Sequence, residues 1–383
     1  MKTKPAKPTK APKAKVPTAV HLERKFEEEI EAVLLARGYT QGHPGDFNAA
    51  LGMDPKAVVS FIQDTQPKAW DRLVKSHGHE VEAKVAKYIR AEMNRRGTVD
   101  VLRHGVTDRG IKIKLAFMPP ASGLNPEVVK AYAQNRLTLV RQLPYKPNSG
   151  QTIDTAILLN GIPVATLELK TPLTCQTAQD AISQYRNDRD PQAPVLGFKS
   201  GAVVHFAVDP DDVWMTTHLC GKSTRFLPFN KGDGHGKGNP PNPKGYKTAY
   251  LWEEVLERDS LMDILARFVQ TQTETKRLPN GTKTKVEKLL FPRYHQLDVV
   301  RECVEDARKN GAGQAYLIQH SAGSGKTNSI AWLAHRLSTL HDEDDNNVFD
   351  SVIVVTDRIV LDDQLQDAIA QFEHKQGVVE AIT

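Results

Sequence analysis

Two carboxylates and a lysine stand at a spacing that suits phosphodiester chemistry. Asp154 precedes the dipeptide Asn160-Gly161, and Glu168 and Lys170 follow it, in the run "QTIDTAILLNGIPVATLELK". Two carboxylates can hold Mg²⁺ beside a scissile phosphate, and a lysine can position water or offset the charge that grows on the phosphate oxygens. The alternative is an ordinary salt-bridged sheet face, since acids and lysines are common on solvated strands.

The element that must position these side chains is a β-hairpin over residues 151–170, because Asn-Gly between two alternating runs is typical of a tight turn. Glu168 and Lys170 are two residues apart and therefore point to one face. A plain two-residue turn would place Asp154 opposite Leu167, on the other face. We therefore predict either a three-residue loop with Gly161 left-handed or a β-bulge, which brings Asp154 onto the face of Glu168. An unbroken ladder would exclude the site.

The surrounding pattern alternates between helical and strand-like segments. Helices are predicted over residues 22–39, 55–96, 177–188 and 250–269, strands over 112–117, 136–145, 202–209 and 212–217, and a Gly/Pro-rich loop over 230–246. The segment "RNDRD" (186–190) is interpreted as a solvated charge run. This order indicates an α/β protein with a mixed sheet.

A second motif lies between an apolar run and an amphipathic one in "AYLIQHSAGSGKTNSIAWLAHRL" (315–337). Gly323 and Gly325 would let backbone N–H groups surround phosphates, Lys326 would reach the terminal phosphates, and Thr327 would ligate Mg²⁺. His320 stands where the strict P-loop motif has glycine. With strands expected at 315–319 and 350–357 and a helix at 358–372, we predict a parallel, right-handed βαβ unit.

Nothing after this unit supplies an acidic strand end to hold the metal or a second motor lobe. Both are needed to cleave ATP in such motors. We therefore expect that this chain does not hydrolyse ATP alone and that it is either an N-terminal portion of a motor protein or the product of a truncated gene.

Composition restricts the class of protein. A chain of 383 residues with 39% hydrophobic residues predicts two or three domains. We expect a cytoplasmic protein without membrane contact, because no secretory signal or long apolar run occurs and the three cysteines are widely spaced. The net charge of +5 comes from six lysines in residues 1–20; without them, 45 basic residues face 46 acidic ones. We predict a disordered basic arm there, which either contacts nucleic acid or keeps the protein soluble.

The motifs in this order resemble the N-terminal part of the restriction (R) subunit of type I restriction-modification systems. The resemblance rests on "IDTAILLNGIPVATLELKTP", "AISQYRND", "GAVVHFAVDPDDVWMTT" and "FPRYHQ…HSAGSGKT…VVTDRIVLDDQL" and covers about residues 22–383. It implies a PD-(D/E)xK endonuclease domain with helices flanking a mixed sheet (21–228), a loop and helical linker (229–285), and part of a RecA-like ATPase lobe (286–383). It also implies Mg²⁺, ATP, double-stranded DNA, and methyltransferase and specificity subunits as cofactors and partners.

The resemblance also implies roles for single residues. Asp154 and Glu168 would be the metal ligands and Lys170 the catalytic lysine. Gln184 matches the glutamine of the family's Q-x-x-x-Y motif, although Asp188 stands at the tyrosine position and Tyr185 is adjacent. The supporting acid of the first helix would be Glu27, with Glu23 as the alternative. Gln296 stands where helicase-like ATPases place a glutamine that reads adenine. A non-catalytic module for DNA binding or complex assembly is the competing interpretation.

Overall fold

The computed structural model describes residues 19–120, 125–171, 175–234, 236–277 and 282–356, together with residue 369. Most of the predicted basic arm lies outside this range, but Ala19 and Val20 already form the first turn of the first helix. The helix predicted over 358–372 also lies outside it, apart from residue 369. In the part of the chain that the structure describes, no helix is long and apolar enough to cross a bilayer.

A seven-stranded mixed sheet forms the centre of the molecule, in the order β1-β4-β5-β6-β7-β8-β9. Its strands are β1 (Thr40–Gln41), β4 (Leu137–Pro144), β5 (Thr152–Leu159), β6 (Ile162–Leu169), β7 (Val204–Val208), β8 (Val213–Thr216) and β9 (Leu227–Pro228). The β1/β4 and β6/β7 pairs are parallel and the other pairs are antiparallel. The predicted hairpin is thus the β5–β6 pair at the centre of the sheet.

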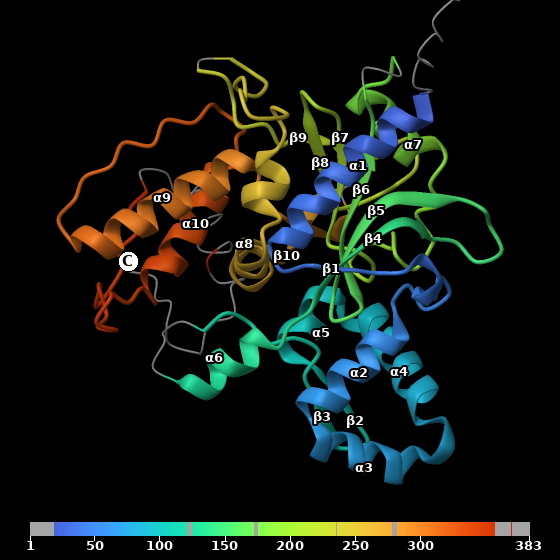
Figure 1. Ribbon diagram of the computed structural model, residues 1–383. Helices are drawn as coiled ribbons and strands as arrows, with labels where there is room; N and C mark the ends of the chain where they lie inside the picture. Colours follow the sequence, from blue (N-terminus) through green and yellow to red (C-terminus); the bar gives the residue numbers. More distant parts are fainter. Residues whose placement is uncertain are drawn as a thin grey trace, which may run out of the picture.

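Two helices cover the sheet near the predicted site (Figure 1). Helix α1 (Ala19–Ala36) buries Phe26, Ile30 and Leu34, the i, i+4, i+8 stripe seen in the sequence, against the larger hydrophobic core. Helix α7 (Ala178–Asn187) buries Ala181, Ile182 and Tyr185 in a second core. Because β6 contributes to the first core while α7 packs on β6 and β7 in the second, the hairpin is covered on both faces.

A small helical region lies at the lower end of the sheet in Figure 1. It contains α2 (Pro55–Thr65), α3 (Pro67–His77), α4 (Val81–Arg96), α5 (Thr98–His104), the turns η1 (Pro44–Asp46) and η2 (Gly78–Glu80), and the hairpin β2 (Val106–Asp108) and β3 (Ile111–Ile113). The helical prediction for residues 55–96 is confirmed, with breaks at Gln66 and Gly78. A further helix, α6 (Pro126–Ala133), connects this region to β4.

The strand predicted over 112–117 is wrong in length, because β3 ends at Ile113 and pairs with β2 instead of the central sheet. The side chain of Gln66 accounts for the early end. Its amide accepts from the backbone N–H of Lys114 at 2.7 Å and donates to the carbonyl of Lys114 at 2.9 Å. A side-chain amide thereby takes both ladder positions that a neighbouring strand would need.

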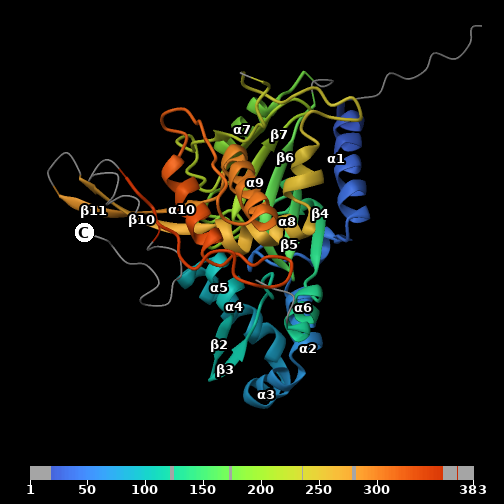
Figure 2. The same cartoon turned by 90° about the vertical axis from the view of Figure 1, so that its left-hand side faces the viewer.

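The C-terminal part contains π-helical turns η4 (Leu251–Val255) and η5 (Ile264–Phe268), helix α8 (Arg258–Asp263), the hairpin β10 (Gln270–Arg277) and β11 (Lys283–Leu290), and helices α9 (Tyr294–Asn310) and α10 (Lys326–Leu337). The helix predicted over 250–269 is therefore interrupted, with extended backbone at Glu257. The β10–β11 hairpin, which projects from the body in Figure 2, had no counterpart in the prediction.

The two strands predicted beside the P-loop are not formed in the described residues 282–356. Leu317 is 93% exposed and Val355 is 86% exposed, although both lie in apolar runs. Parallel strands are stable when neighbouring strands and helices cover them on both faces. Neither run is covered on both faces: residues 312–319 are exposed, and residues 351–356 alternate between exposed and half-buried, with Val354 packed against the larger hydrophobic core.

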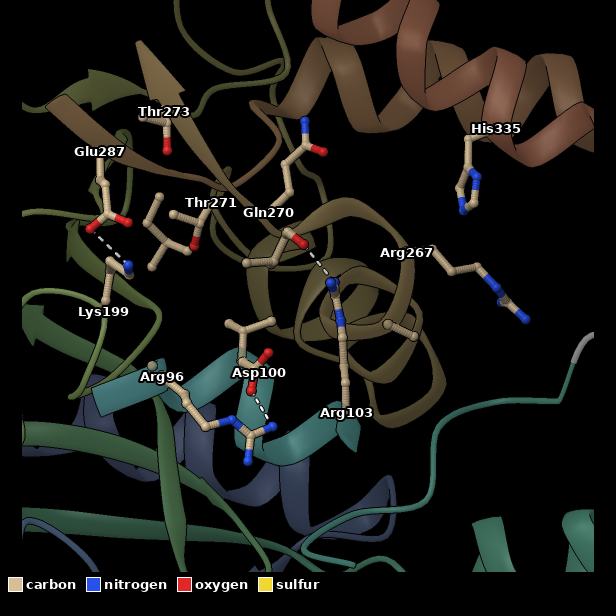
Figure 3. A pocket seen from close by; sticks show the side chains of 15 residues that line it. Arg96, Asp100, Arg103, Lys199, Arg267, Gln270, Thr271, Thr273, Glu287 and His335 are labelled. Atoms are coloured by element: carbon tan, nitrogen blue, oxygen red, sulfur yellow. Dashed lines mark hydrogen bonds and ion pairs between the residues drawn. The ribbon is translucent and has the colours of Figure 1, made fainter. Parts of the chain in front are cut away.

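The junction between the helical region and the C-terminal part encloses a cavity of about 450 Å³ (Figure 3). Its basic side chains bind groups of the chain itself. The guanidinium of Arg103 donates to the carbonyls of Leu265 and Val269, and Lys199 pairs with Glu287 at 2.8 Å. Because these cations already bind carbonyls or acids of the chain, we interpret the cavity as part of the packing interface between the two parts and not as a ligand site.

Candidate active site

The register of the β5–β6 hairpin contains the predicted bulge. Ile157 pairs with Ala165, but Leu158 pairs with Pro163, so Val164 is the extra residue on β6. The loop itself is a two-residue turn in which Asn160 and Gly161 both have positive φ, 51° and 87°. The bulge prediction is thus confirmed, in preference to the three-residue loop.

The bulge sets which side chains share a face. Thr155 pairs with Leu167, so continuing the ladder by one residue places Asp154 opposite Glu168. The backbone N–H of Leu169 donates to Asp154 Oδ2 at 2.8 Å, and Lys170 Nζ lies 3.9 Å from the same oxygen. The three residues singled out in the sequence are therefore brought together.

Glu168 is fully buried and is held by an arginine that the sequence pattern did not identify. Arg189 Nε donates to Glu168 Oε1 at 2.6 Å, and both side chains are buried. Glu168 Oε2 is also buried and has no hydrogen-bond partner among the described residues. Burial, and then the nearby charge of Asp154, raise the pKa of the Glu168 carboxyl well above its ordinary value, while Arg189 and Lys170 oppose that shift.

Arg189 lies in the "RNDRD" run, and the prediction that this charge run is solvated is wrong at this position, because the Arg189 side chain is buried. The α7 helix ends at Asn187, and the backbone N–H of Arg189 donates to the carbonyl of Gln184. This turn directs the arginine side chain inward, over the ring of Tyr145 at 5.3 Å. Sequence periodicity could not reveal this, because the residue lies beyond the helix whose period was read.

Glu27 of α1 lies on the other side of the site. Its carboxylate accepts from Arg141 Nε at 3.0 Å and from Gln142 Nε2 at 2.9 Å. Burial, followed by the charge of Asp154, raises the pKa of Glu27, while Arg141 and Gln142 lower it. The influence of Asp154 places Glu27 as a third acid near the pair. Glu23 also lies in α1, but its side chain is outside the described residues.

Glu27, Asp154, Lys170 and Gln184 line one open cavity of about 870 Å³. Tyr185 does not line it. The Tyr185 hydroxyl lies 2.8 Å from Thr166 Oγ1, which in turn lies 2.7 Å from His205 Nδ1. Burial lowers the pKa of His205 to about 3, so the imidazole in this network is neutral. Gln184 of α7 therefore lines the cavity, whereas the adjacent Tyr185 packs in the second hydrophobic core.

The P-loop residues lie at the N-terminus of α10. Gly323 and Gly325 have positive φ, 75° and 85°, and Gly325 caps the helix. With Gln296 they line a cavity of about 540 Å³. The amide of Gln296 donates to the carbonyls of Ser324 and Gly325.

Lys326 and Thr327, in the first turn of α10, are not among the lining residues of that cavity. The Lys326 ammonium donates to the carbonyl of His320 at 2.8 Å. The structure therefore brings together three of the five residues predicted for nucleotide binding, and the lysine contacts its own loop.

Fold and site are consistent with an α/β protein of nuclease-like construction, with a cavity of mixed charge beside a central hairpin and a Gly-rich loop before α10. The family described as "Type I restriction enzyme R protein N terminus" matches residues 23–223, more than half of the chain. The chain belongs to this family. A second description, "SWI2/SNF2 ATPase", matches residues 295–382.

A curated relative agrees with the family. The chain is 25% identical over 259 residues to the "Putative type I restriction enzyme MjaVIIIP endonuclease subunit" of Methanocaldococcus jannaschii. The similarity covers 64% of this chain and 22% of the relative. The chain thus spans about a fifth of the length of that relative.

Proposed function

We propose that this chain carries the nuclease centre of a type I restriction enzyme R subunit and cleaves DNA phosphodiester bonds with Mg²⁺. The observation that carries this proposal is the bulge at Val164, which places Asp154 and Glu168 on one face next to Lys170. Without the bulge, the same residue types would lie on opposite faces of a buried sheet. A salt-bridged surface does not account for a carboxylate that is fully buried.

The residues present fit a divalent cation. Mg²⁺ is commonly held by one or two carboxylates, with water and substrate phosphate completing its shell. Asp154 and Glu168 would hold the ion, and the unpartnered Glu168 Oε2 is a natural ligand atom. When bound, the ion would supply positive charge for the phosphate as the bond to the leaving oxygen breaks.

The chain's own residues have separate tasks in this proposal. The Lys170 ammonium, 3.9 Å from Asp154 Oδ2, offsets negative charge on the phosphate and orients the attacking water. Gln184 contributes an amide that hydrogen-bonds substrate or water in the cavity. Glu27 holds Arg141 and Gln142 at the cavity wall and adds negative field beside Asp154. The basic residues at the wall then face the DNA backbone.

The ATP-dependent half of the function is also a proposal. The match to SWI2/SNF2 ATPases and the positive-φ glycines before α10 support ATP binding by Gln296, Gly323, Gly325, Lys326 and Thr327. Translocation of double-stranded DNA, with methyltransferase and specificity subunits as partners, would belong to the longer protein.

The test is cleavage of supercoiled plasmid in Mg²⁺ or Mn²⁺ by the chain and by its Glu168→Ala and Lys170→Ala variants. We expect each variant to lose at least about 100-fold in rate. Lys199→Ala serves as a matched control, because Lys199 pairs with Glu287 at the distant junction. In the assembled enzyme, Lys170→Ala should remove cleavage and leave ATP hydrolysis intact. Equal cleavage by wild type and Glu168→Ala would contradict the proposal and favour a binding or assembly module.

A further inference from the structure

Arg189 binds the proposed metal ligand Glu168 outside the cavity. Asp154 and Lys170 line the cavity, whereas Glu168 and Arg189 do not. The guanidinium reaches only Oε1 of Glu168, at 2.6 Å, and leaves Oε2 without a partner among the described residues. A carboxylate bound at one oxygen has its plane fixed, so the second oxygen has a defined direction.

The Arg189 side chain is also held by a contact with the ring of Tyr145. Its guanidinium carbon lies 5.3 Å from the centre of the Tyr145 ring, a stacking distance. Tyr145 is fully buried, and its hydroxyl lies 2.7 Å from Gln151 Oε1 and 3.2 Å from the carbonyl of Asp188. Tyr145 is thus hydrogen-bonded both to the residue just before β5, the strand that carries Asp154, and to the turn that carries Arg189.

The same turn connects Arg189 to Gln184. The carbonyl of Gln184 accepts from the backbone N–H groups of both Asp188 and Arg189. The other end of α7 is anchored as well, because the N–H of Ala178 donates to Asp209 Oδ2 at 2.7 Å. The C-terminal end of α7 therefore sets the position of two side chains: Gln184, which lines the cavity, and Arg189, which binds Glu168.

We propose that Arg189 is a positioning residue of the nuclease centre, which orients Glu168 through Oε1 so that Oε2 is presented to the divalent cation. The inference rests on the proposed function, because it assumes that Glu168 is a metal ligand. A buried arginine that only neutralised the charge of Glu168 would not need to stack on Tyr145, and it would not need to contact one carboxylate oxygen alone. Residues that orient a ligand in this way typically change metal affinity or activity by about 10- to 100-fold.

The experiment compares the wild-type chain with Arg189→Met, Arg189→Lys and Arg186→Met. Arg186, in the last turn of α7, is a matched control, since it also lies over an aromatic ring, that of Phe226, and it donates to the backbone carbonyl of Thr224. Two quantities are measured. One is Mn²⁺ binding by electron paramagnetic resonance in the absence of DNA; the other is plasmid cleavage as a function of Mg²⁺ concentration. Thermal unfolding is recorded for every variant.

We expect Arg189→Met to weaken Mn²⁺ binding by about 10-fold or more and to raise the Mg²⁺ concentration for half-maximal cleavage by a similar factor. Arg189→Lys should recover part of the affinity, because an ammonium can donate to Oε1 but cannot stack flat on Tyr145. Arg186→Met should bind the ion as the wild type does. If Arg189→Met does not fold, the shift in the folded Arg189→Lys variant decides the matter.

Three outcomes are distinguishable. Unchanged Mn²⁺ affinity in both Arg189 variants, with an active wild type, overturns the positioning role and leaves the nuclease proposal standing. Tighter Mn²⁺ binding in Arg189→Met also overturns it, because the arginine would then compete with the cation. A wild-type chain that neither binds Mn²⁺ nor cleaves plasmid contradicts the proposed function itself.

Discussion

At the scale of single residues, two neighbouring side chains of α7, Gln184 and Tyr185, have different environments. Gln184 lines the cavity next to Lys170, while Tyr185 is fully buried and bonded to Thr166. Successive residues of a helix point about 100° apart, so they cannot serve the same surface. The tyrosine expected four residues after Gln184 is replaced by Asp188, and Tyr185 does not take its place in the cavity.

We predict that Gln184→Ala lowers the plasmid cleavage rate by about tenfold, the equivalent of one positioned hydrogen bond in the transition state. Tyr185→Phe is the matched change on the adjacent position. It should reduce the unfolding free energy by about 1 kcal/mol through loss of the contact with Thr166 and leave the cleavage rate unaltered. Cleavage rates and chemical denaturation measure the two effects. A larger rate loss in Tyr185→Phe would argue against this division.

At the scale of elements, the hairpin tip is fixed by contacts from distant parts of the chain. The Asn160 side chain accepts from the N–H of Arg136 and donates to the carbonyl of Leu115. The carbonyl of Gly161 accepts from the N–H of Asp54, the residue that caps α2. A Cβ at Gly161 would lie 2.6 Å from the carbonyl oxygen of Asp54. These contacts keep the turn to two residues and leave the register shift to Val164.

We therefore expect Gly161→Ala to destabilise the protein by about 2 kcal/mol, the sum of a left-handed residue and a backbone clash. Gly110→Ala is its control, because Gly110 has a φ of +79° but nothing within 4 Å of an added Cβ. The control should cost about 1 kcal/mol, from the left-handed backbone alone. Denaturant midpoints of the two variants test this, and equal losses would mean that the contact with Asp54 contributes nothing.

A second element-scale feature is the carboxylate that joins three helical segments. Asp263, at the end of α8, pairs with Arg267 at 2.7 Å, Arg336 at 2.6 Å and Arg301 at 3.3 Å. Burial alone would raise the pKa of Asp263, but the three arginines outweigh it and hold the pKa below the ordinary value. The ion pairs thus tie η5, α9 and α10 to one short helix.

We predict that Asp263→Asn lowers the unfolding free energy by about 2 kcal/mol at pH 7, because it leaves three half-buried arginines without their anion. The pKa is depressed in the folded state, so this stabilisation is complete above the unfolded-state pKa of about 4 and is lost as pH falls through the folded-state pKa. The difference between wild type and variant should shrink below about pH 4. Chemical denaturation at several pH values measures it, and a constant difference would contradict the assignment.

At the scale of the whole molecule, the helical region contacts the C-terminal part through α5. Figure 3 shows Arg103 reaching from α5 to the end of η5, where it donates to the carbonyls of Leu265 and Val269. A guanidinium at the C-terminal end of a helical turn satisfies carbonyls that would otherwise be unpaired. This contact is a means by which the two parts keep a fixed orientation.

We expect Arg103→Met to loosen the junction, with a loss of about 2 kcal/mol and faster limited proteolysis between residues 265 and 290. Lys199→Ala removes a pair that lies on the rim of the same cavity, with Lys199 and Glu287 side chains 22% and 48% exposed. That variant should cost less than about 1 kcal/mol, because exposed ion pairs contribute little. Identical proteolysis of both variants would show that Arg103 does not hold the junction.

The sequence alone determined the chemistry-bearing residues and most of the local elements near them. The Asn-Gly turn, the hairpin and the helix after it follow from local preferences, and the need for Asp154 and Glu168 to share a face required an even register. The P-loop glycines were also identifiable, since few residues other than glycine adopt the positive φ found at Gly323 and Gly325.

Tertiary structure decided the rest. The position of the bulge, the inward turn of Arg189 beyond α7, and the early end of β3 at Gln66 all depend on contacts between segments that are distant in sequence. The apolar runs at 315–319 and 350–356 show the reverse case, since a strand-like pattern does not form a strand in the described residues. Local pattern sets what a segment can form, and the partners that reach it decide which of those forms is stable.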